Sequence, residues 1–73
     1  MRKVFKVQDL DCANCAAKME DRIKTVDGVE SASMRFMTQK LVIEVADPDR
    51  LDEIMDKVQE ICKSIEPDMV ILR

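Results

Sequence analysis

The sequence contains no histidine, tryptophan or tyrosine, and only one glycine and two phenylalanines among its 73 residues. Without histidine, neither an imidazole metal ligand nor an imidazole general base is available. The two aromatic rings, Phe5 and Phe36, are too few for a surface on which nucleic-acid bases stack. The net charge of −3 also opposes binding to a phosphate backbone. The composition therefore excludes imidazole chemistry and argues against a nucleic-acid partner.

No apolar run approaches the ~20 residues of a membrane-spanning helix, and no apolar stretch follows the first four residues as it would in a secretory signal. Apolar residues make up 47% of the chain and charged residues 37%, which is typical of a globular protein rather than a disordered one. A chain of this length forms one small core. We therefore expect a single domain over residues 1–73 that is cytoplasmic, monomeric and not inserted directly into a membrane.

Three cysteines are present, and an odd number does not suit a disulfide framework. Reduced thiols in a reducing compartment are the better interpretation. Two of the cysteines lie in the segment Asp11-Cys12-Ala13-Asn14-Cys15, between a strand-like run and a helix-like run. Thiolates favour soft or borderline ions such as Cu(I) and Zn(II), and an added carboxylate shifts the preference towards a divalent ion. Cys12 and Cys15 are therefore candidate metal ligands, and Asp11 is either a third ligand or the N-cap of the following helix.

The place of these thiols at a predicted helix N-terminus bears on their chemistry. Free backbone N–H groups and the helix dipole stabilise anions there, which predicts a lowered pKa for Cys15. A thiolate pair of this spacing serves metal binding and thiol–disulfide exchange alike. The third cysteine, Cys62, lies on the apolar stripe of a later helix and is expected in the core. It becomes a third thiolate ligand only if the end of that helix faces the loop.

Hydrophobic periodicity predicts six secondary-structure elements. Asp47-Pro48 suits a helix start, and Asp27-Gly28 and Glu66-Pro67 suit helix ends. The predicted elements are a strand at 2–8, a helix at 13–26, strands at 29–36 and 40–46 joined by a short turn, a helix at 48–65 and a strand at 69–72. This order is that of a ferredoxin-like βαββαβ sandwich, an α+β fold with a four-stranded antiparallel sheet and two helices on one face. The order and the small size do not suit a thioredoxin-like oxidoreductase.

The core is expected between the helices and the inward face of the sheet. Leu10, just before the cysteine segment, is expected to pack into it. Met19, Met34 and Met55 lie on apolar faces and are expected to fill the core, whereas Met37 lies at a turn and is expected to be exposed. The second predicted helix carries a continuous apolar stripe, which indicates core packing: Leu51, Ile54, Met55, Val58, Ile61, Cys62 and Ile65.

Two segments of the sequence resemble a known family. Residues 10–16, Leu-Asp-Cys-Ala-Asn-Cys-Ala, and residues 26–32, Val-Asp-Gly-Val-Glu-Ser-Ala, resemble the heavy-metal-associated domain. That domain occurs as free metallochaperones and as N-terminal metal-binding modules of heavy-metal-transporting P-type ATPases. The resemblance extends from Lys3 to Leu72 and implies the same order of elements that periodicity predicts. It also implies a metal-binding module that is not an enzyme by itself.

The residues before the first cysteine indicate a branch of this family. Its copper-binding members usually have Met-Thr or Met-His there, whereas this chain has Leu10-Asp11, which resembles the zinc, cadmium and lead exporters. The resemblance implies that Asp11, Cys12 and Cys15 hold Zn(II), Cd(II) or Pb(II), for delivery to or regulation of an efflux ATPase. The implied partners are the membrane-embedded transporter domains or a related heavy-metal-associated domain. The alternative is a Cu(I) metallochaperone that uses Cys12 and Cys15 alone.

Overall fold

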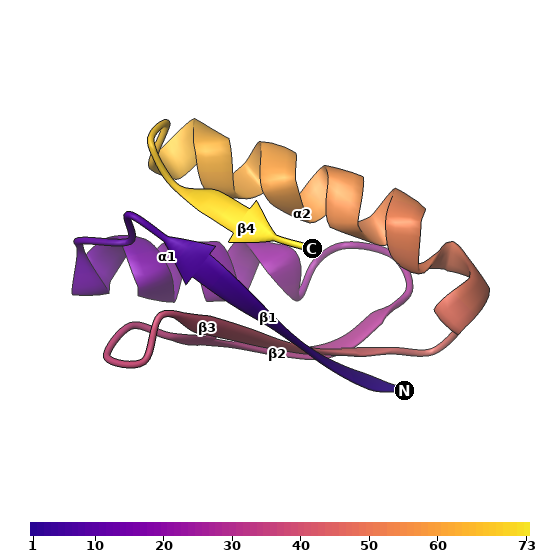
Figure 1. The fold of residues 1–73 in the computed structure, drawn as a ribbon. Coiled ribbons are helices and arrows are strands. Elements are labelled where there is room, and N and C mark those ends of the chain that lie inside the picture. Colours follow the sequence, from indigo (N-terminus) through magenta and orange to yellow (C-terminus); the bar gives the residue numbers. More distant parts are fainter.

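The computed structural model describes all of residues 1–73 and contains the six predicted elements in the predicted order (Figure 1). The four strands form one antiparallel sheet in the order β2-β3-β1-β4, and both helices pack on it and against each other. The predicted ferredoxin-like fold is therefore confirmed. Its elements are β1 (Arg2–Gln8), α1 (Ala13–Ile23), β2 (Val29–Arg35), β3 (Lys40–Val45), a short 3-10 helix η1 (Pro48–Arg50), α2 (Leu51–Ile65) and β4 (Val70–Leu72).

The core lies between the helices and one face of the sheet, where the alternating strand residues and the helical stripes meet. Met19, Met34 and Met55 are buried as predicted, and Met37 at the hairpin turn is 89% exposed, also as predicted. No helix is long and apolar enough to cross a membrane. The buried residues form one cluster: Val7, Leu10, Ala16, Met19, Ile23, Ala32, Met34, Leu41, Ile43, Val45, Ile54, Met55, Val58, Cys62, Met69 and Ile71.

Several element boundaries differ from the prediction. Strands β2 and β3 each end one residue early, at Arg35 and Val45. Helix α1 ends at Ile23 rather than at residue 26, because the N–H groups of Thr25 and Val26 bond three residues back and form turns instead of continuing the helix. Strand β4 begins at Val70 rather than at Met69, since the Met69 N–H also bonds three residues back. The segment from residue 48 starts as a 3-10 helix, and Asp47 caps it by accepting from the Asp49 N–H at 3.0 Å.

Three connections lie at the same end of the molecule (Figure 1). They are the loop between β1 and α1, the turn between β2 and β3, and the loop between α2 and β4. Hydrogen bonds between Leu10 and Gln39 join the first connection to the second. The electrostatic influence of Glu66 on the loop thiols places the third beside the first. This end of the fold therefore gathers side chains that are far apart in the sequence.

Candidate metal centre

The loop between β1 and α1 carries the paired cysteines and is anchored in the core just before them. Its residue Leu10 is 1% exposed and packs into the core, as predicted. Asp9, just before it, has a left-handed backbone (φ 62°), which turns the chain at the end of β1. Helix α1 then begins at Ala13. The loop–helix junction predicted from the sequence is thus present, with a buried anchor directly before the candidate ligands.

The first cysteine caps the helix. The Cys12 backbone is extended (φ −129°), its carbonyl accepts from the Ala16 N–H at 3.0 Å, and its Sγ accepts from the Cys15 N–H at 3.3 Å. The alternative in which Asp11 is the N-cap is therefore wrong, because the Cys12 sulfur occupies that role. Both thiols are free and partly exposed, so an ion can approach both from solvent.

The two thiols differ in acidity. Hydrogen bonds from the Cys15 side chain and backbone lower the pKa of Cys12. The hydrogen bond between the two side chains, together with desolvation and the charge of Cys12, raises the pKa of Cys15 to about 11. The prediction of a lowered pKa for Cys15 was therefore wrong. Only the first thiolate gains the donors of the helix N-terminus, and once Cys12 is ionised it disfavours a second negative charge at Cys15.

A carboxylate that sequence reasoning did not select as a site residue lies beside these thiols. Glu66 follows the last residue of α2, is partly buried, and is held by a backbone hydrogen bond from its N–H to the Cys62 carbonyl at 2.8 Å. Its negative charge raises the pKa of both Cys12 and Cys15, so the Glu66 carboxylate acts electrostatically on the pair. One sequence signal for it is that the predicted topology brings the loop after the second helix near the cysteine segment.

The two remaining candidate residues, Asp11 and Cys62, lie in opposite environments. Asp11 is exposed and its side chain makes no hydrogen bond or ion pair with the protein. The structure contains no preassembled group of three or more histidine, cysteine, aspartate or glutamate side chains positioned to hold a metal ion. Cys62 is fully buried in the core, as predicted, and burial raises its pKa to about 11. The geometry thus brings Cys12 and Cys15 together, with Asp11 adjacent in the chain.

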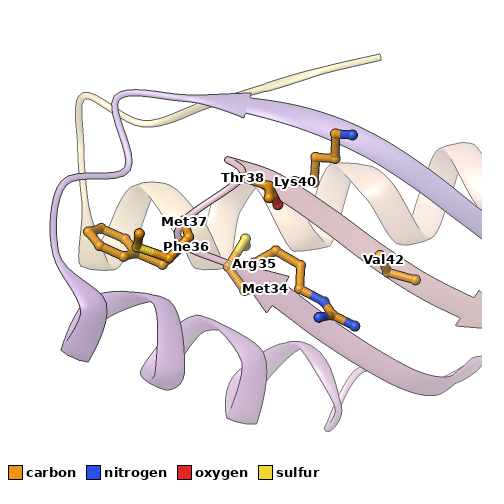
Figure 2. Close-up of a pocket in the computed structure, with 7 residues that line it drawn as sticks. All are labelled: Met34, Arg35, Phe36, Met37, Thr38, Lys40 and Val42. Atoms are coloured by element: carbon orange, nitrogen blue, oxygen red, sulfur yellow. The ribbon is translucent and has the colours of Figure 1, made fainter.

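A hollow of about 480 Å3 lies beside the β2–β3 hairpin rather than at the thiols (Figure 2). Its lining offers cations at Arg35 and Lys40 and the exposed thioether of Met37, but no thiolate or carboxylate. This hollow does not suit a divalent metal ion. The lining residues are Met34, Arg35, Phe36, Met37, Thr38, Lys40 and Val42.

Comparison with known proteins points to one family. The family model of the heavy-metal-associated domain matches residues 4–66. A zinc/cadmium/lead-transporting P-type ATPase of Escherichia coli (strain K12) is 36% identical over 59 residues, which cover 81% of this chain and 8% of that protein. A cadmium, zinc and cobalt-transporting ATPase of Bacillus subtilis (strain 168) is 28% identical over 71 residues, covering 97% of this chain and 10% of that protein. The chain thus spans about a tenth of the length of these relatives.

Solved structures share the fold. The N-terminal domain of ZntA in the apo-form superposes with a TM-score of 0.70 at 26% identity, covering 99% of this chain and 92% of that one. A structure described as CopZ metallochaperone superposes with a TM-score of 0.71 at 14% identity, covering 99% of this chain and all of that one. The second likeness shows the fold alone.

Proposed function

The chain belongs to the heavy-metal-associated domain family, and from this premise we propose that Asp11, Cys12 and Cys15 bind a divalent zinc, cadmium or lead ion. The ion is held for delivery to, or regulation of, a heavy-metal efflux P-type ATPase. The observation that carries the proposal is the pair of free, partly exposed thiols at the start of α1, with the Cys12 Sγ accepting from the Cys15 backbone N–H at 3.3 Å and Asp11 directly before them. The module binds metal and performs no catalysis by itself.

The donor set suits a divalent ion of intermediate softness. Zn(II) prefers four ligands, and sites that exchange their ion keep a position open. Two thiolates and the Asp11 carboxylate supply three donors, and Glu66 is a further carboxylate whose charge already acts on both thiols. Three anionic donors leave a Zn(II) complex with a net charge of about −1, which a helix N-terminus stabilises.

Binding must overcome the protons on the thiols. The pKa of Cys15 is about 11 in the metal-free protein, so at neutral pH this thiol carries its proton and the incoming ion must displace it. Cys12, whose pKa is lowered, is the thiol that meets the ion first. Apparent affinity therefore rises with pH. The exposed loop supports exchange of the ion with a partner, which would be the membrane-embedded domains of a transporter or a second heavy-metal-associated domain in the cytoplasm.

The relatives support the divalent ions over copper. These relatives are named as cadmium-, zinc-, cobalt- and lead-transporting ATPases, and this chain has Asp11 where the copper-binding branch of the family usually has threonine or histidine. A Cu(I) metallochaperone is the second candidate. It is favoured by one observation, which is that the structure assembles two thiols and no third ligand group, since two thiolates alone suit linear Cu(I) coordination.

The test of metal binding is a titration of the fully reduced protein with Zn(II) in competition with a chromogenic chelator. One equivalent is expected to bind tightly to the wild type, and Cys12→Ser and Cys15→Ser are each expected to lose that binding. Cys62→Ala is the matched control, because this thiol lies in the core, and it should bind as the wild type does. Tight binding that survives both loop substitutions, or none in the wild type, would contradict the proposal.

A further inference from the structure

One side chain ties the metal loop to the β2–β3 hairpin. The Gln39 Oε1 accepts from the Leu10 N–H at 3.2 Å, and the Gln39 Nε2 donates to the Leu10 carbonyl at 2.6 Å. No other hydrogen bond holds residues 9–11, which lie between the last residue of β1 and the helix cap at Cys12. The residue directly before the candidate ligands is therefore fixed by its buried side chain and by one amide 29 positions away in the sequence.

This contact requires an amide of this length. The Gln39 Nε2 also donates to the Phe36 carbonyl at 3.0 Å, so both of its N–H groups have acceptors and the amide orientation is determined. Glutamate would keep the acceptor and lose both donors. Methionine would fill a similar volume and lose donor and acceptor together. Asparagine is one methylene shorter and would not span the same gap.

The backbone of Gln39 is fixed as firmly as its side chain. It has a left-handed conformation (φ 54°) at the end of the hairpin turn, and its carbonyl accepts from the Val7 N–H in β1 at 3.0 Å. Gln39 is thus bonded through its main chain to Val7, near the end of β1, and through its side chain to Leu10 in the metal loop. Gln39 does not belong to the lining of the hollow beside the hairpin (Figure 2). Its amide instead joins the hairpin, at the Phe36 carbonyl, to the metal loop, at Leu10.

We infer that Gln39 is a positioning residue of the metal centre. It orders Leu10, and thereby the start of the Asp11–Cys12 segment, before an ion arrives, without touching the ion itself. A loop that is ordered in advance loses less conformational freedom when it binds. Groups that orient metal ligands from outside the coordination sphere typically change affinity by about 10–100-fold when removed. This inference rests on the proposed metal-binding function of the loop.

The test compares Gln39→Met and Gln39→Glu with a matched control, Gln59→Met. Gln59 is also a partly buried glutamine that accepts from a distant backbone N–H, that of Ile71 at 3.1 Å, but it lies on α2 and has no bond to the metal loop. Zn(II) affinity is measured by chelator competition at a temperature where circular dichroism shows each variant fully folded. The absorption of the Cd(II)–thiolate complex and the rate at which the chelator removes the ion are measured in parallel.

Both Gln39 variants are expected to bind Zn(II) about tenfold or more weakly and to release it faster, while Gln59→Met binds as the wild type does. If Gln39→Met does not fold, Gln39→Glu, which keeps the bond to the Leu10 N–H, decides the question alone. Wild-type affinity and release rate in the folded Gln39 variants, even with lowered stability, would overturn the inference and leave the metal site standing. Absence of Zn(II) binding by the wild type would instead overturn the proposed function.

Discussion

The Cys15 N–H donates to the Cys12 Sγ at 3.3 Å, so the two thiols of the metal loop are chemically unequal. Cys12 collects the hydrogen bonds of the helix start and its pKa is lowered, whereas the pKa of Cys15 is raised to about 11. In the metal-free protein Cys12 therefore ionises first, and Cys15 keeps its proton to higher pH. An ion that binds both sulfurs must replace that proton, which links metal capture to pH.

Limited alkylation is expected to label Cys12 first. Because the thiolate is the reactive form, the reduced metal-free protein treated briefly with iodoacetamide near pH 8 should carry label mainly at Cys12, with little at Cys15. Cys62 serves as the internal control, since it is fully buried and should remain unlabelled while the protein is folded. Peptide mapping by mass spectrometry gives the ratio of label at Cys12 to label at Cys15. Equal labelling of the two loop cysteines, or label that favours Cys15, would contradict the assigned acidities.

The buried thiol makes folding sensitive to alkaline pH. Burial raises the pKa of Cys62 from its ordinary value of 9.0 to about 11. Between these two values the unfolded chain has lost the proton that the folded chain keeps, so the free energy of unfolding falls as pH rises through this range. Cys62→Ala should lower stability at neutral pH by about 1 kcal/mol through lost packing and should show a shallower alkaline decline.

Urea unfolding of the wild type and Cys62→Ala at several pH values between about 7 and 11 measures that difference. Every other ionisable group is the same in both proteins, so the difference between the two curves isolates Cys62. If the free energies of unfolding of the two proteins changed in parallel with pH across the whole range, burial would not be holding the proton on the Cys62 thiol.

Local periodicity was enough to predict the fold, whereas the chemistry of the site depends on contacts across the chain. Of the apolar stripe predicted on the second helix, Ile54, Met55, Val58 and Cys62 are buried, and the remaining three residues are partly buried and pack against the core. Gln39 and Glu66 were not selected as site residues, because the contacts that give them a role are made across the chain. Their roles arise from Leu10 and the thiols, which are distant in the sequence.

The acidity of Cys15 was mispredicted for a related reason. The helix N-terminus has donors for one anion, and the spacing of the two cysteines alone does not say which sulfur takes them. The structure shows that Cys12, as the N-cap, accepts from the Cys15 N–H. The preference of a helix start for anions was correctly anticipated, but the thiol that benefits from it was not.

Gly28→Ala should destabilise the fold without altering the metal centre. Gly28 has φ +95°, and a Cβ there would lie 3.0 Å from the Ile54 Cδ1 in the core. Strain in this backbone region and the close contact together should lower the free energy of unfolding by about 1–3 kcal/mol. Chemical denaturation measures the loss, and Zn(II) affinity of the folded variant should match the wild type. A weakened metal site in this variant would show that affinity depends on general stability.

Glu66→Gln separates two effects of one carboxylate. Its charge raises the pKa of both loop thiols, so the substitution should let them ionise at lower pH, as read from thiolate ultraviolet absorbance. Zn(II) affinity should nevertheless fall, by about tenfold, because the carboxylate attracts or ligates the ion. Asp68→Asn, in the same loop and exposed, is the control and should change neither quantity. A gain in Zn(II) affinity in Glu66→Gln would show that this carboxylate acts on the thiols alone.

The central claim is that Asp11 joins Cys12 and Cys15 in holding a divalent ion. The most direct test measures Zn(II) and Cu(I) affinities, each by chelator competition, in the wild type and in Asp11→Ala, with Asp9→Ala as the control for the loss of a nearby loop carboxylate. The account predicts that Asp11→Ala weakens Zn(II) binding by about 10–100-fold and leaves Cu(I) binding, which needs only the two thiolates, unchanged. Equal Zn(II) affinity in the wild type and Asp11→Ala would contradict the account and would make the Cu(I) metallochaperone the better description.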